Sequence, residues 1–267
     1  MDGKTKAEAF DALHHDGRIL VLPNAWDAAS AAVMEDAGAK AVATSSAAVA
    51  WAHGYPDGDA LPLARLLATV ETVARAVKVP VTADIEGGYT DDLAELAETV
   101  KAVIGAGAVG INLEDGHRAP DLQARKIEAA RKAADGAGVP LFINARTDVF
   151  LKRLAEGHAA YMATVERAEL YRGAGASGVF VPGPSDPDLI DRLADEIRLP
   201  LNIMLVRGLP KAEQLQALGV RRLSSGAAPF MGAYATLAKA IAAYLADGDA
   251  TAFNAEGLGN LNARFGA

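Results

Sequence analysis

Charged side chains follow three short apolar runs of the sequence. Asp84 comes directly after the first run with Glu86 two residues further on, Glu114 directly follows the second run, and Arg146 lies three residues after the end of the third. The three runs are Val81–Ala83, Gly110–Leu113 and Leu141–Ile143. Apolar runs of this length between helical stretches are typical of buried parallel strands. Because carboxylates are too costly to leave unpaired in an apolar core, we expect them at the rim, where they can hold a cation or a substrate.

Asp84, Glu86 and Glu114 form a candidate metal site. Asp84 and Glu86 are two residues apart, which places both side chains on the same side of an extended backbone. Oxygen ligands with open positions for water suit Mg²⁺. Carboxylates gathered at one rim would also repel one another strongly without a cation or an arginine among them. We therefore predict a Mg²⁺ site here, and we assign the nearby Asp91 and Asp92 only to capping the next helix.

Arg146 is the candidate substrate-binding cation. It follows Asn144 at the end of its run, and a planar guanidinium at that place suits a bidentate grip on a carboxylate or phosphonate. The alternative is a structural ion pair with Glu114 or Asp148. The two roles are compatible, so both stay open.

Small residues end the second predicted strand, over 44–48. Ser45, Ser46 and Ala47 leave room for a ligand to approach the backbone, and their successive N–H groups can cradle an oxyanion. This pattern is a weak indication by itself. Asp57, in the loop that follows, is a candidate base or a residue that orients one.

His117 is a further catalytic candidate. It lies with Arg118 just beyond Glu114, in a loop that can close over the rim, although a lone histidine in a loop is more often a bystander. Three other histidines are interpreted as solvated helix residues: His14, His15 and His158.

The elements that position these residues alternate along the chain. Helical segments rich in alanine separate eight runs that resemble strands: Arg18–Leu22, Ala41–Thr44, Val79–Ala83, Gly110–Leu113, Val139–Ile143, Gly178–Val181, Leu199–Met204 and Arg221–Ser224. Such alternation predicts parallel strands with right-handed crossovers. Eight units favour a (β/α)8 TIM-type barrel, with the active site at the carboxyl ends of the strands. An open doubly wound sheet is the rival fold, but residues 23–27 are not the glycine-rich loop it would need.

The end of the chain carries an additional helix. Pro229–Ala246 is long, rich in alanine and apolar, and no further strand follows it. We expect one barrel domain over 1–267 with residues 229–267 as a C-terminal helical extension. This helix either covers the outer wall of its own barrel or, as the apolar surplus favours, packs on a neighbouring subunit.

Composition excludes several classes of protein. The chain has 267 residues, of which 51% are hydrophobic and 22% charged, so a large core is feasible and wholesale disorder is not expected. A net charge of −8 without a dominant basic patch argues against nucleic acid and anionic membranes as partners. The absence of cysteine excludes disulfides and thiolate nucleophiles. With no signal segment and no apolar run long enough to span a membrane, a cytoplasmic protein is expected.

The sequence resembles the isocitrate lyase and phosphoenolpyruvate mutase superfamily. The resemblance rests on motifs that occur in the expected order from the first predicted strand to the fifth, and that are specific only in combination. The motifs are Pro23–Asp27, Thr44–Ser46 with Asp57 twelve residues after Ser45, Ala83–Tyr89, Asn112–Asp115 and Asn144–Asp148. Asn202 fits a later strand more loosely.

The resemblance implies a Mg²⁺-dependent enzyme, with Mn²⁺ as an alternative ion, that acts on small 2-oxo acids or their enolates. It places the metal on Asp84, with waters held by Glu86 and Glu114. The backbone amides of Ser46 and Ala47, next to Ser45, match those that bind the enolate oxygen.

Other positions complete the implied site. Arg146 and Asn202 match substrate-binding positions, and Asp57 lies by the metal. The shared chemistry is a pyruvate enolate, stabilised by a Lewis acid as a C–C or P–C bond breaks. The apolar surplus of the C-terminal helix predicts a homo-oligomer, a dimer or tetramer with the tetramer favoured, and the resemblance adds that C-terminal helices are often exchanged between subunits.

Three departures narrow the expected reaction. The family's lyases carry a Lys-Lys-Cys-Gly-His loop, whereas this chain has no cysteine. The mutase and the phosphonopyruvate hydrolase carry a longer loop with Lys and Asn, whereas Gly116–Asp121 is short and has neither. Glu86 stands where the family usually has Asp. We therefore expect a lyase or decarboxylase of a 2-oxo dicarboxylic acid; a P–C bond hydrolase or mutase, and a 2-oxo-acid-binding protein without turnover, remain the alternatives.

Overall fold

The computed structural model of the protein describes residues 2–253 and 258–266. Every strand pairs with its neighbours in parallel, in the order β1-β9-β8-β7-β6-β5-β4-β3-β2. The strands are β1 Leu20–Leu22, β2 Asn24–Ala25, β3 Val42–Thr44, β4 Val81–Asp84, β5 Gly110–Glu114, β6 Phe142–Arg146, β7 Gly178–Val181, β8 Leu201–Met204 and β9 Arg222–Ser224. Each of the eight predicted runs therefore overlaps a strand.

The ring of strands closes at Pro23. β1 pairs with β9 and β2 pairs with β3, and Pro23 alone separates β1 from β2. Because proline has no backbone N–H, it interrupts the ladder of hydrogen bonds at this point. β1 and β2 are thus two pieces of one barrel strand, and the expected (β/α)8 TIM-type barrel is confirmed.

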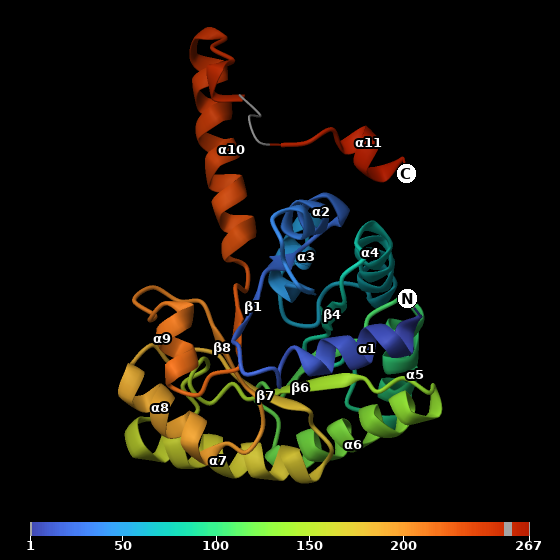
Figure 1. Cartoon of the computed structure of the whole chain (residues 1–267), viewed down its shortest axis with the longest axis vertical. Helices are drawn as coiled ribbons and strands as arrows, with labels where there is room; N and C mark the ends of the chain where they lie inside the picture. The colour runs from blue at the N-terminus through green and yellow to red at the C-terminus, as the bar shows by residue number, and fades with distance from the viewer. Residues whose placement is uncertain (1, 254–257, 267) are drawn as a thin grey trace.

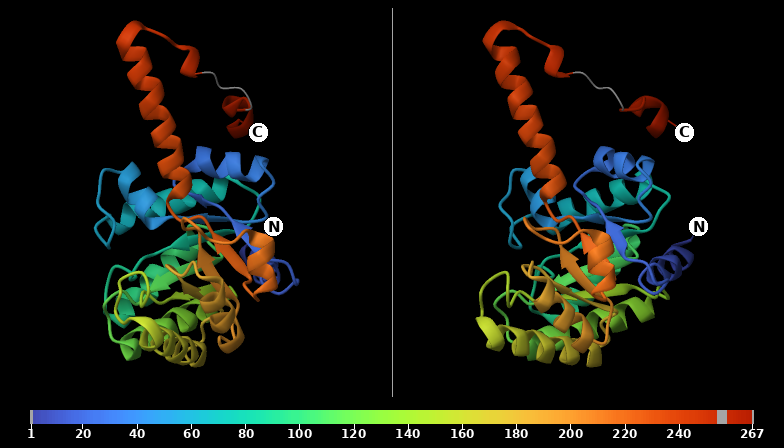
Figure 2. Two further views of the ribbon diagram at one scale, coloured as in Figure 1. Left: turned by 90° about the vertical axis from the view of Figure 1, so that its left-hand side faces the viewer. Right: turned by 60° about the vertical axis from the view of Figure 1, so that its left-hand side comes forward.

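Helices surround the barrel on its outer side (Figures 1 and 2). Their apolar faces pack against the strands, for example through the buried Leu96 and Val100 of α5. The α-helices are α1 Gly3–Ala12, α2 Ala28–Asp36, α3 Ser46–Ala52, α4 Leu63–Ala76, α5 Leu93–Gly105, α6 Pro120–Gly136, α7 Gly157–Gly173, α8 Pro187–Glu196, α9 Ala212–Ala217, α10 Ala228–Asp247 and α11 Leu261–Phe265. A short 3₁₀ helix covers Thr251–Phe253.

Helix α2 begins after Asp27, its N-cap, whose side chain accepts a hydrogen bond from the N–H of Ser30. Asn24 lies in β2, where its Oδ1 accepts hydrogen bonds from the N–H groups of Ser225 and Gly226. The side chain therefore ties the two ends of the barrel ring together.

Helix α1 covers the amino-terminal end of the barrel. Phe10 packs edge-on against Phe142 at a ring separation of 5.5 Å. Gly110 makes room for this contact, since a Cβ there would lie 2.8 Å from the Phe10 ring. The expectation that His14 is solvated was wrong: it is 1% exposed and stacks on Phe142 at 4.0 Å. Sequence periodicity could not show this contact, because it joins residues far apart in the chain.

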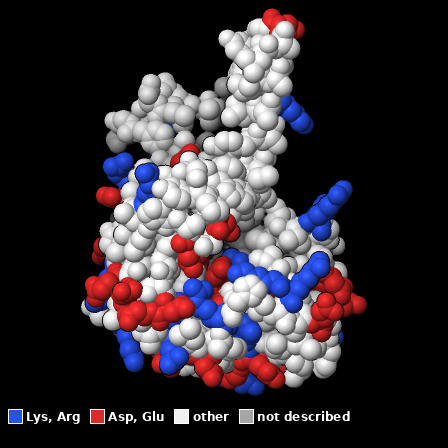
Figure 3. Space-filling view, turned by 180° about the vertical axis from the view of Figure 1, so that it is seen from behind, with Lys and Arg blue, Asp and Glu red and all other residues white. Residues whose placement is uncertain are grey.

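Helix α10 leaves the barrel and projects away from it (Figures 1 and 2). Apolar side chains on it are half exposed: Met231, Tyr234, Leu237, Ile241, Tyr244 and Leu245. In Figure 3 the projecting segment is almost free of charge, whereas the barrel shows many side chains of both signs. Part of the expected 229–267 extension, residues 254–257 and 267, lies outside the described residues. None of the described helices combines the length and apolar character needed to cross a membrane.

Candidate active site

A cavity of about 180 Å³ opens at the carboxyl ends of the strands. Residues from β2, β4, β5, β6, β7, β8 and β9 line it, together with the start of α3 and the loop after it. Six predicted site residues are among them: Ser45, Ser46, Ala47, Asp57, Asp84 and Arg146. A larger hollow of about 750 Å³ lies between α2, α4 and the chain's tail, but it is remote from these strand ends, so the smaller cavity is the candidate site.

Asp84 ends β4 and is 7% exposed. Its Oδ2 accepts a hydrogen bond of 3.3 Å from the Ser46 hydroxyl, and its Oδ1 accepts one of 3.2 Å from the N–H of Glu86. Burial raises the pKa of this carboxyl, although Arg146 opposes the shift. Asp84 is thus a buried carboxyl group that forms part of the cavity wall.

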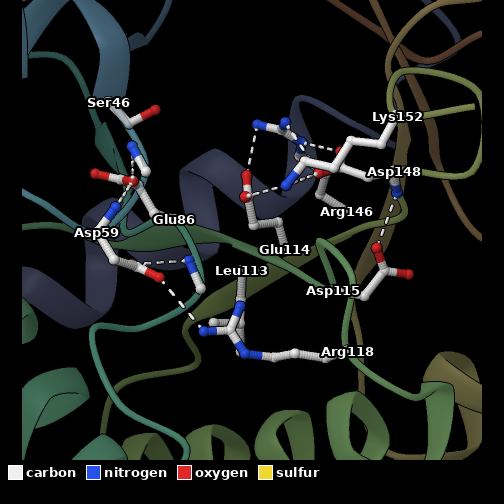
Figure 4. A network of polar contacts seen from close by, with 12 residues as sticks. Ser46, Asp59, Glu86, Leu113, Glu114, Asp115, Arg118, Arg146, Asp148 and Lys152 are labelled. Carbon is white, nitrogen blue, oxygen red and sulfur yellow. Dashed lines mark hydrogen bonds and ion pairs between the residues drawn. The ribbon is translucent and has the colours of Figure 1, made fainter. Parts of the chain in front are cut away.

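Arg146 lies between two carboxylates (Figure 4). Its Nη1 is 2.8 Å from Glu114 Oε2, and its Nε is 2.7 Å from Asp148 Oδ1. Burial disfavours the charge, but Glu114 and Asp148 outweigh it and raise the pKa of the guanidinium. Lys152 Nζ adds a second cation, 3.5 Å from Glu114 Oε1 and 3.2 Å from Asp148 Oδ2. The ion pairs that the sequence left open are therefore present.

The start of α3 presents two backbone N–H groups near the cavity. Ser45 is the N-cap, and its hydroxyl accepts a hydrogen bond of 3.4 Å from the N–H of Ala48. Among the described residues, the N–H groups of Ser46 and Ala47 have no hydrogen-bond partner, as expected for the first turn of a helix. Both residues line the cavity, so the predicted oxyanion cradle is geometrically available.

Four predicted site residues do not line the cavity. Glu86 and Glu114 are each bonded to neighbouring protein groups instead. Asn202 is buried in β8, and its Oδ1 accepts a hydrogen bond of 3.2 Å from Ser224, which does line the cavity. His117 is exposed in the turn between β5 and α6.

Several residues of the site were not singled out from the sequence. Phe180, Met204 and Ser224 line the cavity from β7, β8 and β9. Met204 and Ser224 each lie two residues after an inward-facing polar residue, so strand alternation is the signal that could have found them. Asp59 and Lys152 had no such signal.

The assignment of Asp91 to helix capping alone was wrong. Asp92 is the N-cap of α5, whereas Asp91 Oδ1 lies 2.6 Å from Arg118 Nε and 2.8 Å from Lys126 Nζ. Lys126 is fully buried and comes from α6, so this ion pair depends on the packing of two helices. The local pattern of three polar residues before a helix could not reveal it.

The donor set of the cavity fits a hard divalent cation. Burial raises the pKa of Asp84, and burial, with smaller contributions from neighbouring carboxylates, raises those of Glu86 and Glu114 to about 7. Among residues 2–253 and 258–266, no three His, Asp or Glu side chains converge as a complete ligand set. Mg²⁺ usually takes one or two carboxylates and keeps several waters. Two carboxylates, Asp57 and Asp84, lie on the cavity wall, and Asp84 is the one that would hold such an ion directly.

Comparison with known proteins agrees with this geometry. The family model for phosphoenolpyruvate phosphomutase matches residues 10–245. The chain belongs to this family. The phosphomutase family is part of the superfamily that the sequence motifs indicated, so that prediction is confirmed.

Proteins similar to this chain carry the names of different activities. The Mycobacterium tuberculosis protein Rv1998c is 38% identical over 226 residues, which cover 83% of each chain. Oxaloacetate decarboxylase of Pseudomonas entomophila is 28% identical over 232 residues, covering 84% of this chain and 80% of the relative. A Burkholderia cenocepacia crystal structure, provisionally described as a phosphonomutase, is 45% identical with a TM-score of 0.85 and covers 88% of this chain and 98% of that one. Members of the superfamily are lyases and mutases that act on small acids, and this chain is an enzyme of that type.

Proposed function

We propose that this protein is a Mg²⁺-dependent carbon–carbon lyase or decarboxylase that acts on a small 2-oxo dicarboxylic acid through an enolate. The observation that carries the proposal is one cavity lined by a buried carboxylate, Asp84, a guanidinium, Arg146, and two backbone N–H groups that have no hydrogen-bond partner within the described part of the chain. Its volume of about 180 Å³ is below the roughly 300–1,000 Å³ typical of pockets for drug-sized ligands. A substrate of only a few carbons fits this space.

Arg146 would bind a substrate carboxylate. Glu114 and Asp148 hold the guanidinium on two sides, so its remaining donors keep one direction toward the cavity. A bidentate contact to a planar carboxylate then fixes the orientation of the substrate. Phe180, whose ring centre is 5.7 Å from the guanidinium carbon, limits movement on the third side.

The start of α3 would stabilise the charge that develops on the 2-oxo oxygen. The N–H groups of Ser46 and Ala47 are fixed by the helix, so they need no rearrangement when that charge forms. Bound Mg²⁺ would supply Lewis-acid stabilisation of the same charge. Asp57 lines the same cavity and is the candidate base, or the group that orients one.

The apolar part of the lining would protect an enolate from unwanted protonation. Leu151, Phe180 and Met204 face the cavity together with the polar groups. An enclosed site with few waters strengthens each electrostatic contact with the substrate.

Cleavage of a P–C bond is the second candidate reaction. The similarity to the Burkholderia cenocepacia structure supports this candidate. The charge of the lining favours the C–C reaction instead. Among the described residues that line the cavity, Arg146 is the one cationic side chain, whereas a phosphonate carries more negative charge than a carboxylate.

We also propose a homo-oligomer, a dimer or tetramer, built through α10. Six large apolar side chains of this helix are 40% to 76% exposed, and contiguous exposed apolar surface marks an interaction site. A neighbouring subunit of the same chain would cover it.

A substrate screen tests the proposed reaction. Purified protein with Mg²⁺ is given 2-oxo dicarboxylic acids, and pyruvate is followed with a coupled dehydrogenase, while phosphonopyruvate is followed by phosphate release. The proposal expects pyruvate from a dicarboxylic acid and loss of the signal on chelation. Phosphate release alone would instead support the P–C reaction, and binding without any product would support a binding protein.

A further inference from the structure

We infer that Glu86 is a positioning residue whose side chain holds the loop that carries Asp57. The resemblance implies a metal-bound water for this position, and the family usually has the shorter Asp there. The contacts of Glu86 in this chain are of a different kind, and they depend on the length of the glutamate side chain. The inference rests on the proposed function for the role of Asp57, but not for the contacts themselves.

Both carboxylate oxygens of Glu86 are bonded to protein groups. Oε2 accepts a hydrogen bond of 2.7 Å from the N–H of Gly58, and a second one from the N–H of Asp59. Oε1 accepts a hydrogen bond of 3.2 Å from the hydroxyl of Tyr89. Glu86 is 3% exposed, so water competes little for these contacts.

The side chain of Asp59 in turn binds backbone N–H groups in the loop that carries Glu86. Its Oδ1 accepts hydrogen bonds from the N–H groups of Gly87, at 3.2 Å, and Tyr89, at 3.3 Å. Each acidic side chain thus binds the backbone of the other residue's loop. We call this reciprocal arrangement of Glu86 and Asp59 the loop clasp; both residues are labelled in Figure 4.

The backbone of the loop clasp is strained. Asp59, Glu86 and Tyr89 have φ values of 58°, 51° and 63°, in the left-handed region that residues other than glycine rarely adopt. Such residues persist only where surrounding contacts hold them, and they are frequent at functional sites. The hydrogen bonds of the loop clasp connect these three residues to one another, which accounts for their persistence.

Arg118 extends the loop clasp to a third loop. Its Nη2 lies 3.4 Å from Asp59 Oδ2, and its Nε lies 2.6 Å from Asp91 Oδ1. The guanidinium covers Gly87, where a Cβ would collide with it. The loops after α3, β4 and β5 are therefore fastened together on one side of the cavity.

The loop clasp fixes the position of Asp57. Asp57 directly precedes Gly58, whose N–H is bonded to Glu86, and it lines the cavity. With the next two amides fixed, the Asp57 carboxylate has a defined place beside Asp84. An aspartate at position 86 is shorter by one C–C bond, about 1.5 Å, and could not reach the same amides.

Two substitutions distinguish the effect of the length of the Glu86 side chain from the effect of its negative charge. Glu86→Gln keeps the length, because its amide oxygen can accept from Gly58 and Asp59 and its NH₂ can donate to the Tyr89 hydroxyl. Glu86→Asp keeps the charge and supplies the residue usual in the family, but loses the reach. Amide hydrogen exchange at 58–59, in protein without metal or substrate, reports on the loop clasp independently of any reaction.

We expect faster exchange at residues 58–59 in Glu86→Asp, by about tenfold, as for the loss of one or two hydrogen bonds to a charged group. In Glu86→Gln, the amides at residues 58–59 should exchange within about threefold of the parent rate. This change is smaller than the loss of one such hydrogen bond would cause. Tyr89→Phe removes only the hydroxyl and should shift exchange in the same direction by less, so it decides the matter if Glu86→Asp does not fold.

The opposite pattern would overturn the inference. If the amides at residues 58–59 exchange at the parent rate in both variants at position 86, Glu86 does not hold the loop. If Glu86→Asp does not fold, a parent rate in Tyr89→Phe leads to the same conclusion. If in addition Glu86→Gln weakens Mg²⁺ binding by titration calorimetry while Glu86→Asp preserves it, the charge serves the metal instead. Either result leaves the proposed reaction untouched, whereas an inactive parent protein with the predicted exchange pattern would refute only the reaction.

Discussion

Arg146 and Glu114 face each other across two neighbouring strands of the barrel, with Arg146 Nη1 2.8 Å from Glu114 Oε2. Asp148 binds the same guanidinium from the other side, at 2.7 Å from Nε. A third contact joins Arg146 Nη2 to Asp148 Oδ2 at 3.3 Å. Because a guanidinium has five N–H donors, these three contacts leave some of them for a ligand. The ion pairs and the proposed grip on a substrate are therefore compatible in one side chain.

Arg146→Lys should reduce activity by about tenfold or more, equivalent to about 1.4 kcal/mol or more. An ammonium retains the charge between Glu114 and Asp148 but cannot reproduce the bidentate fork. Steady-state rates on the substrate found in the screen, beside thermal unfolding midpoints, check this. An unfolding midpoint that collapses while the folded fraction keeps its specific activity would show that Arg146 is only structural.

Asp84→Ala should remove the stabilisation that Mg²⁺ gives to the folded protein. A ligand that binds only the native state stabilises it by about 2.7 kcal/mol at a hundredfold excess over its Kd. Thermal scans with and without Mg²⁺ measure this difference, and Asp92→Ala, at an exposed helix cap, is the control for loss of one carboxylate. An equal Mg²⁺ effect in Asp84→Ala and the parent would place the ion elsewhere.

His14 should make the protein less stable in mild acid. Burial, with a contribution from Arg222, lowers its pKa from 6.5 to about 3 in the folded state. Between these values the unfolded chain binds a proton that the folded chain does not, so stability is full above pH 6.5 and falls as the pH drops toward 3. At pH 5 the loss is about 2 kcal/mol relative to pH 7.5.

His14→Met tests this prediction, because methionine fills the space beside Phe142 and does not titrate. Urea unfolding of the parent and the variant is compared at pH 7.5 and pH 5.0. The variant should lose distinctly less stability on acidification. Equal losses in the two proteins would show that His14 does not carry the effect.

Truncation before Ala228 should lower the molecular mass in solution or leave insoluble protein. Tyr234, Leu237 and Ile241 follow one another at intervals of three and four residues and are 40% to 47% exposed, so they form a stripe on one face of α10. Light scattering of the full chain should give a mass well above 27.6 kDa. A monodisperse monomer at micromolar concentration would contradict the proposed oligomer.

The barrel was predictable because each strand repeats the same local pattern. β7 has the predicted bounds, Gly178–Val181. The predicted strand before Arg146 ended at Ile143, whereas β6 runs from Phe142 to Arg146. Pro140 explains why β6 starts after the predicted Val139, since a proline cannot donate to the ladder of a central strand.

The site was predictable only where a residue's type reveals its role. Asp84 and Arg146, which line the cavity, could be singled out at strand ends because a buried charged group is costly unless it is paired. The loop clasp of Glu86 and Asp59 was not predictable, because it depends on where two loops meet in space. His14 was misjudged for the same reason.

Exchange of the methyl protons of pyruvate with solvent is the most direct test of the proposed enolate. Pyruvate is incubated in D₂O with the protein and Mg²⁺, and the loss of the methyl proton signal is followed by NMR, with Asp84→Ala prepared in parallel. We expect exchange that depends on protein and Mg²⁺ and that is lost in Asp84→Ala. Pyruvate that binds at the site but keeps its methyl protons, with no product from any 2-oxo dicarboxylic acid, would contradict the proposed function.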